Sequence, residues 1–224
     1  MPEMIFYRRS GKMKKSAPIL LILLFTSGCN SLYYGTMEKF GKYKRDILVD
    51  RVKSARDAQQ ETKEQFTSAL DKFKSVVNVP SGKLQEKYDL LKGELDKSEA
   101  KAAAVKKRIA DVEDVSKALF DEWTKELDQY KNADLRAESK KKLDQTRQKY
   151  TLLINAMKKA DSKIEPVLSA FRDQVLFLKH NLNAQAVASL QSEVTTMEAD
   201  TGKLIEEMEK SIAEADTFIK TMQE

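Results

Sequence analysis

The sequence contains one cysteine, Cys29, and one histidine, His180, and these two side chains limit the chemistry open to the chain. A single thiol excludes an internal disulfide framework and a zinc site built from several cysteines. A single imidazole excludes metal sites that need two or three histidines. Cys29 can therefore act only as a single thiol, and His180 only as a single base.

Two further patterns have part of what catalysis requires. Ser81-Gly82-Lys83 fits one end of a phosphate-binding loop, but that loop needs Gly where Val77 stands and Ser or Thr where Leu84 stands. His180 has no nucleophile elbow or glycine-rich oxyanion loop beside it, so we expect a helix-end residue that interacts favourably with the helix dipole. Acidic residues are interleaved with Lys and Arg, which indicates a solvated face. We expect no enzyme activity, and no metal, cofactor or nucleotide.

Cys29 follows a segment typical of an export signal. Basic residues within 8–15 precede nine apolar residues, 17–25, a run too short to span a bilayer as a helix. The stretch 24–29 resembles the lipobox of bacterial lipoproteins, in which the peptide is cut before the cysteine and the thiol receives diacylglycerol; Thr26 departs from the usual leucine. We predict that residues 1–28 are a removed signal peptide and that Cys29 is lipidated. An ordinary secretory signal with an incidental cysteine and a short membrane anchor are the alternatives.

The residue after the cysteine bears on localisation. An Asp there resembles the inner-membrane retention signal of Gram-negative lipoproteins, and this chain has Asn30. We predict a lipid anchor in the periplasmic leaflet of the outer membrane, with the periplasmic face of the inner membrane as the alternative. Residues 29–36 are uncharged and are predicted to form a short lipidated tether. Translation starts either at Met1 or at Met13, since the basic residues after Met13 would begin a compact signal.

The net charge of +5 comes largely from the N-terminal segment. Residues 1–28 carry five basic residues against Glu3 alone, which leaves 35 basic and 34 acidic residues in the remainder. A nearly neutral but densely charged chain is typical of a solvated helical surface rather than a phosphate-binding one. We therefore predict that no nucleic acid is a partner.

Beyond the tether, apolar residues recur at alternating intervals of four and three, the spacing of helices that pack on one another. Four segments follow this pattern: 48–76, 84–130, 143–171 and 187–222. Polar residues such as Gln59, Ser98, Ser116 and Glu126 interrupt the apolar positions. Turns are predicted at 78–82, at 131–133 and, more weakly, at 181–183. The sequence predicts an all-α fold, an elongated antiparallel helical bundle or coiled coil of about four long helices, over residues 37–224.

For the second half of the bundle, the sequence leaves two questions about helix boundaries undecided. Asp161 or Ser162 caps a new helix with Pro166 in its first turn, or Pro166 kinks a continuous helix. The third and fourth segments are either separate or run on as one helix. Residues 132–163 carry a net charge of +5 and residues 164–224 a net charge of −6. These opposite charges favour a side-by-side arrangement of the two segments.

Residues 166–190 carry few charges and include four consecutive apolar residues, 175–178, which cover more than one helix face. Either this region is the best-packed layer of the bundle, or it is a surface for a partner or a second copy. The candidate residues of this interaction surface are Phe171, Val175, Phe177, Leu178 and Leu182.

Several short motifs carry a resemblance to a known family. They are Tyr33-Tyr34, Glu38-Lys39-Phe40-Gly41, Lys44-Arg45-Asp46-Ile47-Leu48-Val49 and the stretch from Phe171 to Ala184. Over roughly residues 29–222 the chain resembles gammaproteobacterial envelope lipoproteins that carry a domain of unknown function, family 2959. The resemblance implies an envelope lipoprotein and gives no biochemical activity. Some members are labelled DNA-repair ATPases, which does not fit a chain with an export signal and no nucleotide-binding loop.

From the sequence we expect a lipid-anchored, periplasm-facing coiled-coil lipoprotein with a structural or adaptor role in the cell envelope. Its predicted partners are the membrane, through the lipid on Cys29, and an envelope protein or a second copy of the chain. The alternative is a chaperone-like module that binds small ligands or peptides between its helices.

Overall fold

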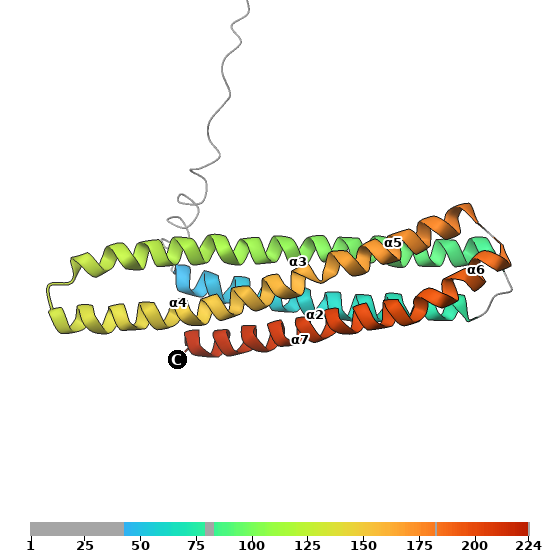
Figure 1. The fold of residues 1–224 in the computed structure, drawn as a ribbon. Coiled ribbons are helices and arrows are strands. Elements are labelled where there is room, and N and C mark those ends of the chain that lie inside the picture. Colours follow the sequence, from blue (N-terminus) through green and yellow to red (C-terminus); the bar gives the residue numbers. More distant parts are fainter. Residues whose placement is uncertain (1–42, 79–82, 182, 224) are drawn as a thin grey trace, which may run out of the picture.

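The computed structural model describes residues 43–78, 83–181 and 183–223. The described residues contain no strand and form α2 (Lys44–Val77), α3 (Leu84–Glu126), α4 (Ala133–Ser162), α5 (Ile164–His180), α6 (Ala184–Leu190) and α7 (Val194–Gln223). Two short 3-10 turns, η1 (Leu127–Gln129) and η2 (Gln191–Glu193), follow α3 and α6. The prediction of an elongated antiparallel helical bundle is confirmed (Figure 1).

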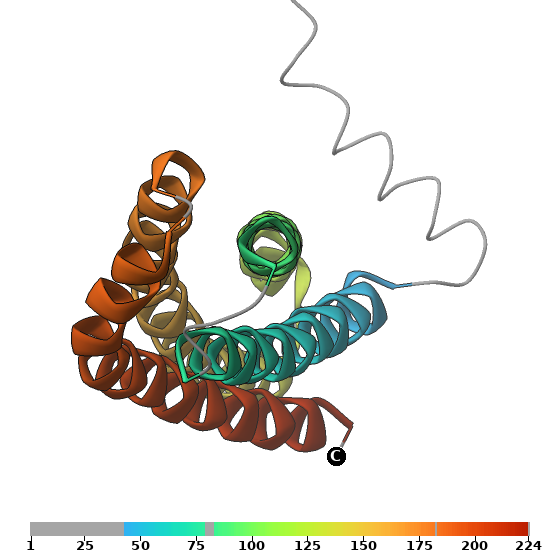
Figure 2. The same cartoon turned by 90° about the vertical axis from the view of Figure 1, so that its right-hand side faces the viewer.

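The chain passes along the rod four times. α2 and α3 lie side by side in opposite directions, α4 and α5 together form the third pass, and α6 and α7 return along α2 and α4. α3 has 43 residues, which corresponds to about 65 Å of helix. Figure 2 looks towards the end where α5 gives way to α6 and shows α2, α3, α5 and α7 arranged around one interior.

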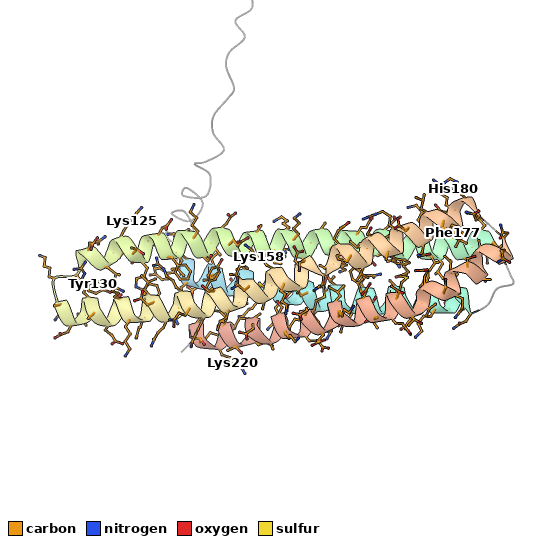
Figure 3. All side chains as sticks on the ribbon, in the orientation of Figure 1. Lys125, Tyr130, Lys158, Phe177, His180 and Lys220 are labelled. Atoms are coloured by element: carbon orange, nitrogen blue, oxygen red, sulfur yellow. The ribbon has the colours of Figure 1, made fainter. Side chains whose placement is uncertain are left out.

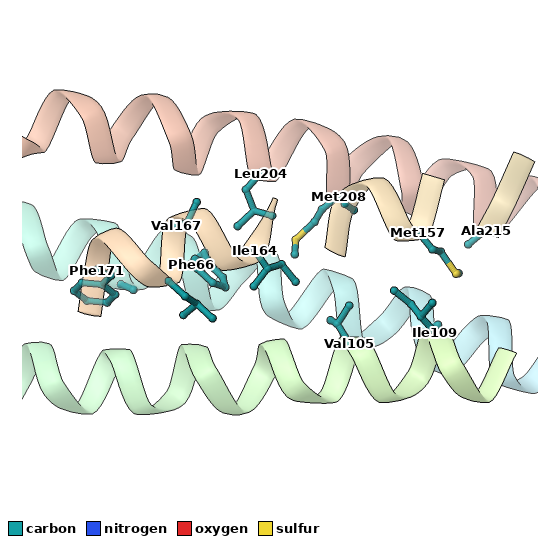
Figure 4. Packing of buried hydrophobic residues seen from close by; sticks show 14 of the residues in the cluster. Phe66, Val105, Ile109, Met157, Ile164, Val167, Phe171, Leu204, Met208 and Ala215 are labelled. Atoms are coloured by element: carbon teal, nitrogen blue, oxygen red, sulfur yellow. The ribbon is translucent and has the colours of Figure 1, made fainter. Parts of the chain in front are cut away.

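The interior is built from the positions spaced by four and three. In α2 every one of them is buried, from Leu48 and Val52 through Phe66 and Phe73 to Val76. Figure 4 shows Phe66 of α2 close to Val167 of α5 and Leu204 of α7, and Val105 and Ile109 of α3 further along the rod. The apolar face predicted from the spacing of four and three therefore packs against other helices of the same chain.

The third pass consists of two helices. α4 ends at Ser162, the N–H of Lys163 bonds to the carbonyls of Ala160 and Asp161, and α5 begins at Ile164. Pro166 therefore stands in a first turn, where its missing N–H costs no helical hydrogen bond. The predicted cap at Asp161 or Ser162 is wrong. The hydroxyl of Ser162 bonds back to the carbonyl of Lys159, and the N-cap residue is Lys163, whose side chain makes no capping bond.

The other turns occur where the sequence placed them. Asn132 caps α4, because its side-chain oxygen accepts hydrogen bonds from the N–H groups of Asp134 and Leu135. α5 ends at His180, and Asn183 caps α6 by accepting from the N–H of Ala186. α5 and α7 are therefore separate helices, not one continuous helix. Of the turn predicted at 78–82, only Asn78 belongs to the described residues; it is the C-cap of α2.

Candidate functional site

The structure separates the five residues of the predicted interaction surface. Phe171, Val175 and Leu178 are buried on the inner face of α5, and the ring of Phe171 meets that of Phe73 edge to face at 6.2 Å. Phe177 is 41% exposed on the outer face. Leu182 lies outside the described residues. Of the four that the structure describes, three thus pack the interior, and only Phe177 is accessible to a partner.

Phe177 and His180 lie at the end of the rod where the third pass turns back (Figure 3). Leu176 beside Phe177 is 53% exposed. His180 is the last residue of α5 and is exposed, as expected for a side chain that interacts with the helix dipole. The four consecutive apolar residues therefore divide into two that pack inward and two that face outward.

Neither a metal site nor a membrane span is present in the part of the chain that the structure describes. Within 43–78, 83–181 and 183–223, no group of three His, Cys, Asp or Glu side chains is placed to hold a metal ion. No helix of the described ranges is both long enough and apolar enough to cross a bilayer. Cys29, the predicted lipidation site, lies outside these ranges.

A groove opens where two of the four passes stop. The first residue of α2 and the last residues of α7 lie at the same level of the rod, while α3 and α4 continue beyond them as a hairpin (Figure 1). The cavity has a volume of about 590 Å³. We call it the end groove and define it by Arg45, Leu119, Glu122, Trp123, Thr146 and Met222, which are among its lining residues.

Polar contacts join the four passes around the end groove. Lys44 of α2 forms a 2.8 Å ion pair with Glu122 of α3. Arg45 donates to the backbone carbonyl of Met222 near the end of α7. Lys149 of α4 donates to the hydroxyl of Thr221 at 3.0 Å. These contacts fix the groove walls. Most of the lining residues are polar or charged, and Leu119, Trp123 and Met222 supply the apolar part.

Beyond the groove, the hairpin of α3 and α4 has a small core of its own. Phe120, Leu127 and Leu143 form this cluster, and Trp123 and Tyr150 pack against it. The indole N–H of Trp123 donates to the hydroxyl of Ser139 at 2.9 Å. Figure 3 shows Tyr130 and Lys125 at this end of the rod, opposite Phe177 and His180.

Charged and aromatic groups meet on one side of the hairpin. The guanidinium of Arg147 lies 5.5 Å from the centre of the Phe120 ring and donates to the hydroxyl of Thr124 at 2.7 Å. Burial raises the pKa of Tyr150, against a hydrogen bond with Ser116 that favours the phenolate. Tyr150 is therefore a neutral packing residue at physiological pH, not a base.

A second groove lies between α3 and α5, with a volume of about 500 Å³. Ala102, Ile164 and Leu168 supply apolar lining, and Asp161 reaches into it. Burial raises the pKa of Asp161, and the positive charge of Lys106 opposes that rise. The raised pKa of Asp161 therefore reflects its partial burial beside α3 and α5.

Sequence analysis did not predict the end groove. The signal was present in the lengths: the apolar spacing of the second segment continues to Tyr130, whereas that of the first begins at Leu48 and that of the fourth ends at Met222. The second segment is therefore longer than its neighbours, and Trp123 lies in the part that extends beyond them.

The comparisons with known proteins identify a family. The family model described as "Protein of unknown function (DUF2959)" matches residues 33–222. No curated protein and no solved structure gives a significant match to this chain. The matched range contains almost all of the described bundle and also residues 33–42, which precede it.

Proposed function

The chain belongs to the DUF2959 family, and from this premise we propose that it is a lipid-anchored, periplasm-facing coiled-coil lipoprotein with a structural or adaptor role in the bacterial envelope. One observation carries the proposal. The only cysteine follows an apolar run and the residues Thr26, Ser27 and Gly28, shortly before a helical rod begins. That order is what lipid attachment to Cys29 requires.

The helical rod supports an adaptor role. Its apolar positions are filled by side chains of the same chain, so the interior needs no ligand for completion. Acyl chains on Cys29 would contribute about 0.8 kcal/mol per buried methylene, which makes anchoring through several chains effectively permanent. A stiff rod fixed at one point presents its exposed ends and sides to other envelope components.

The packing favours an adaptor over a chaperone-like module. The large side chains Phe66, Phe73 and Phe171 of the central layers are at most 2% exposed. The groove between α2 and α7 is lined mostly by polar side chains such as Lys63, Asp71 and Lys72. An apolar client would have to displace packed core residues or bind a charged surface, and both are unfavourable.

The anchor is tested by comparing the native chain with a Cys29→Ser variant in the same cells. We expect the native chain to incorporate an alkyne-labelled fatty acid and to sediment with outer-membrane fractions, and the variant to do neither. An unlabelled native chain, or a variant that sediments like the native chain, would refute lipid anchoring. Sedimentation with inner-membrane fractions would instead support the alternative location.

The adaptor role is tested with a photo-crosslinking amino acid at Tyr130 or at Phe177, two exposed aromatic positions at opposite ends of the rod. We expect one envelope protein to be captured at one of these ends and only from cells with intact Cys29. Capture of a mixed set of unfolded proteins would favour the chaperone-like alternative. Crosslinks only between copies of this chain would favour self-assembly.

A further inference from the structure

The end groove combines a small apolar floor with a charged rim. Leu119 and Trp123 stand four residues apart on one face of α3, and Met222 of α7 is the third apolar lining residue. Leu119 and Met222 are nearly buried, and Trp123 is half-buried. The indole N–H of Trp123 already donates to the hydroxyl of Ser139 at 2.9 Å. What Trp123 offers to a ligand is therefore its ring surface, not a hydrogen-bond donor.

The rim of the groove carries more positive than negative charge. Arg45, Lys142 and Lys149 are among the lining residues, and so are two carboxylates, Glu122 and Glu126. Glu122 is already neutralised by its 2.8 Å ion pair with the first residue of α2. Three cations therefore stand against the single remaining carboxylate of Glu126.

Two of these cations lack an anionic partner. Lys142 and Lys149 stand seven residues apart on the same face of α4. Lys149 donates to the hydroxyl of Thr221 at 3.0 Å, and neither lysine forms an ion pair in the part of the chain that the structure describes. Arg136 and Lys140 of the same helix each pair with a nearby Asp, at 2.7 and 2.6 Å. The two lysines of the groove thus keep their ammonium groups available to an anion.

The size and position of the groove suit a small molecule. Its volume of about 590 Å³ lies within the range of about 300–1,000 Å³ that is usual for ligand sites. It opens where α2 and α7 stop and the hairpin of α3 and α4 continues (Figure 1). Two of its three apolar residues come from α3 and its two unpaired lysines from α4. A ligand with an apolar body and an anionic end can contact both sides at once.

Other kinds of occupant fit the groove less well. A cationic ligand would meet Arg45, Lys142 and Lys149, which have the same charge. An uncharged hydrocarbon would remove water from the lysine ammonium groups without replacing their hydrogen bonds, which is unfavourable. A second copy of the groove would bring its own three cations against these. An anionic head group on an apolar chain avoids all three difficulties.

We propose that the end groove binds a single-chain anionic amphiphile, an alkyl chain with a carboxylate or phosphate head group. The chain lies against Trp123, and Lys142 and Lys149 donate hydrogen bonds to the oxygens of the head group. Charge-assisted hydrogen bonds of this kind are stronger than those between neutral groups. The site lies outside the packed interior and goes beyond the proposed adaptor role. It depends neither on that role nor on a lipid at Cys29.

Trp123 is the only tryptophan of the chain, so its fluorescence reports on the groove. The test uses residues 29–224 with Cys29→Ser, which carry no covalent lipid. Decanoate and decyl phosphate are the probes, each kept below the concentration at which it forms micelles, and decyltrimethylammonium presents the same chain with a cationic head group. We expect a saturable change with at least one anionic probe, and a Kd at least about tenfold higher for the cationic one. The tighter anionic probe identifies the head group as carboxylate or phosphate. No saturable change with either anion, or an equal Kd for the cation, overturns the proposal.

Paired lysine variants test where the head group binds. We expect Lys142→Gln/Lys149→Gln to raise the Kd of the tighter probe at least about tenfold. The matched control, Lys125→Gln/Lys141→Gln, removes two exposed cations that are not among the lining residues and should change the Kd less than about twofold. Equal Kd values for the two double variants overturn the proposal.

A single variant keeps the test independent of the contact between Lys149 and Thr221. Lys142→Gln breaks no ion pair or hydrogen bond of the described bundle, so its urea unfolding should match that of the parent chain. We expect it to raise the Kd at least about threefold. A Kd equal to that of the parent chain would show that Lys142 does not contact the head group, and the proposal would fail.

Discussion

The core contains a few fully buried polar side chains, and most of them find a partner close by. Thr62 donates to the carbonyl of Ala58 at 2.7 Å, and Ser98 donates to the carbonyl of Glu94 at 2.8 Å. Gln59 differs, because its partner is on another helix: its side-chain carbonyl accepts from the hydroxyl of Ser211 at 2.8 Å. Its amide nitrogen has no hydrogen-bond partner in the described part of the chain. This bond sets α2 and α7 in register at some cost in stability.

The two residues of this pair should therefore respond differently to substitution. Ser211→Ala leaves the carbonyl of Gln59 buried without a donor, and we expect it to lower the free energy of unfolding by about 1–3 kcal/mol. Gln59→Leu/Ser211→Ala removes both polar groups and should be nearly neutral or stabilising. Urea denaturation of both variants provides the measurement. A double variant less stable than Ser211→Ala would contradict this account.

Asp161 gives a prediction for the dependence of stability on pH. Burial raises the pKa of its carboxyl in the folded state above the unfolded value, so the ionised form destabilises the fold at neutral pH. Below the unfolded pKa of about 3.9 the carboxyl is protonated in both states, and the cost disappears. We expect Asp161→Asn to raise the free energy of unfolding at pH 7 and to have no effect near pH 3.

The control for Asp161 is Asp173→Asn, the same substitution at an exposed position of α5. It should change the free energy of unfolding by less than about 0.5 kcal/mol at either pH. If Asp161→Asn destabilised the chain at pH 7, its carboxylate would be making a favourable contact and the assignment of its raised pKa to burial would be wrong.

At the scale of the helices, α4 has a side-chain cap at its N-terminus and α5 does not. Asn132 caps α4 through hydrogen bonds of 2.9 and 3.1 Å to the next N–H groups. Lys163 occupies the same position before α5, and its side chain makes no capping bond. A continuous helix is disfavoured here because Pro166 has no N–H to bond the carbonyl of Ser162 and its ring clashes with that carbonyl; no polar side-chain cap starts α5.

The caps should therefore differ in energy. We expect Asn132→Ala to lower the free energy of unfolding by about 1 kcal/mol and Asn132→Asp to restore most of it. Lys163→Ala removes no capping bond and should change the stability by less than about 0.5 kcal/mol. Thermal or urea unfolding of the three variants measures the difference. Equal losses for Asn132→Ala and Lys163→Ala would mean that the Asn132 bonds contribute nothing.

The sequence could predict the helices of this fold and their buried faces, but not every helix boundary. Intervals of four and three identify the helices and their buried faces, because a bundle core requires a continuous apolar face on each helix. They do not predict where a helix is interrupted, since Asp161 and Ser162 are cap-forming residue types that do not cap. Within the dense apolar run the same intervals lead from Phe171 to Val175 and Leu178, which are buried, and leave out Phe177, which is exposed.

The end groove escapes sequence analysis for a physical reason as well. Each helix satisfies its own spacing, and the groove arises only from the relative levels at which α2, α7 and the hairpin end. The long-range pairs of Lys44 with Glu122 and Lys149 with Thr221 define those levels. The segment lengths in the sequence show that the second helix is longer than the first, but they do not show which residues of the two helices are paired.

At the scale of the whole molecule, stability is distributed unevenly along the rod. The main core is one continuous cluster supplied by α2, α3, the third pass and α7. The hairpin beyond the end groove depends on a cluster of three buried residues, Phe120, Leu127 and Leu143, between two helices. Two helices with a small apolar contact area open locally at a lower free energy than four helices around a shared core.

Amide hydrogen exchange should therefore divide α3 into two parts. We expect the backbone amides of residues 120–126, at the hairpin end of α3, to exchange at least about tenfold faster than those of residues 100–116 of the same helix. Leu143→Ala removes a side chain that is 2% exposed and should accelerate exchange in the hairpin while leaving residues 100–116 unchanged. Uniform protection along α3, or acceleration of both parts together, would show that the hairpin and the bundle unfold as one unit.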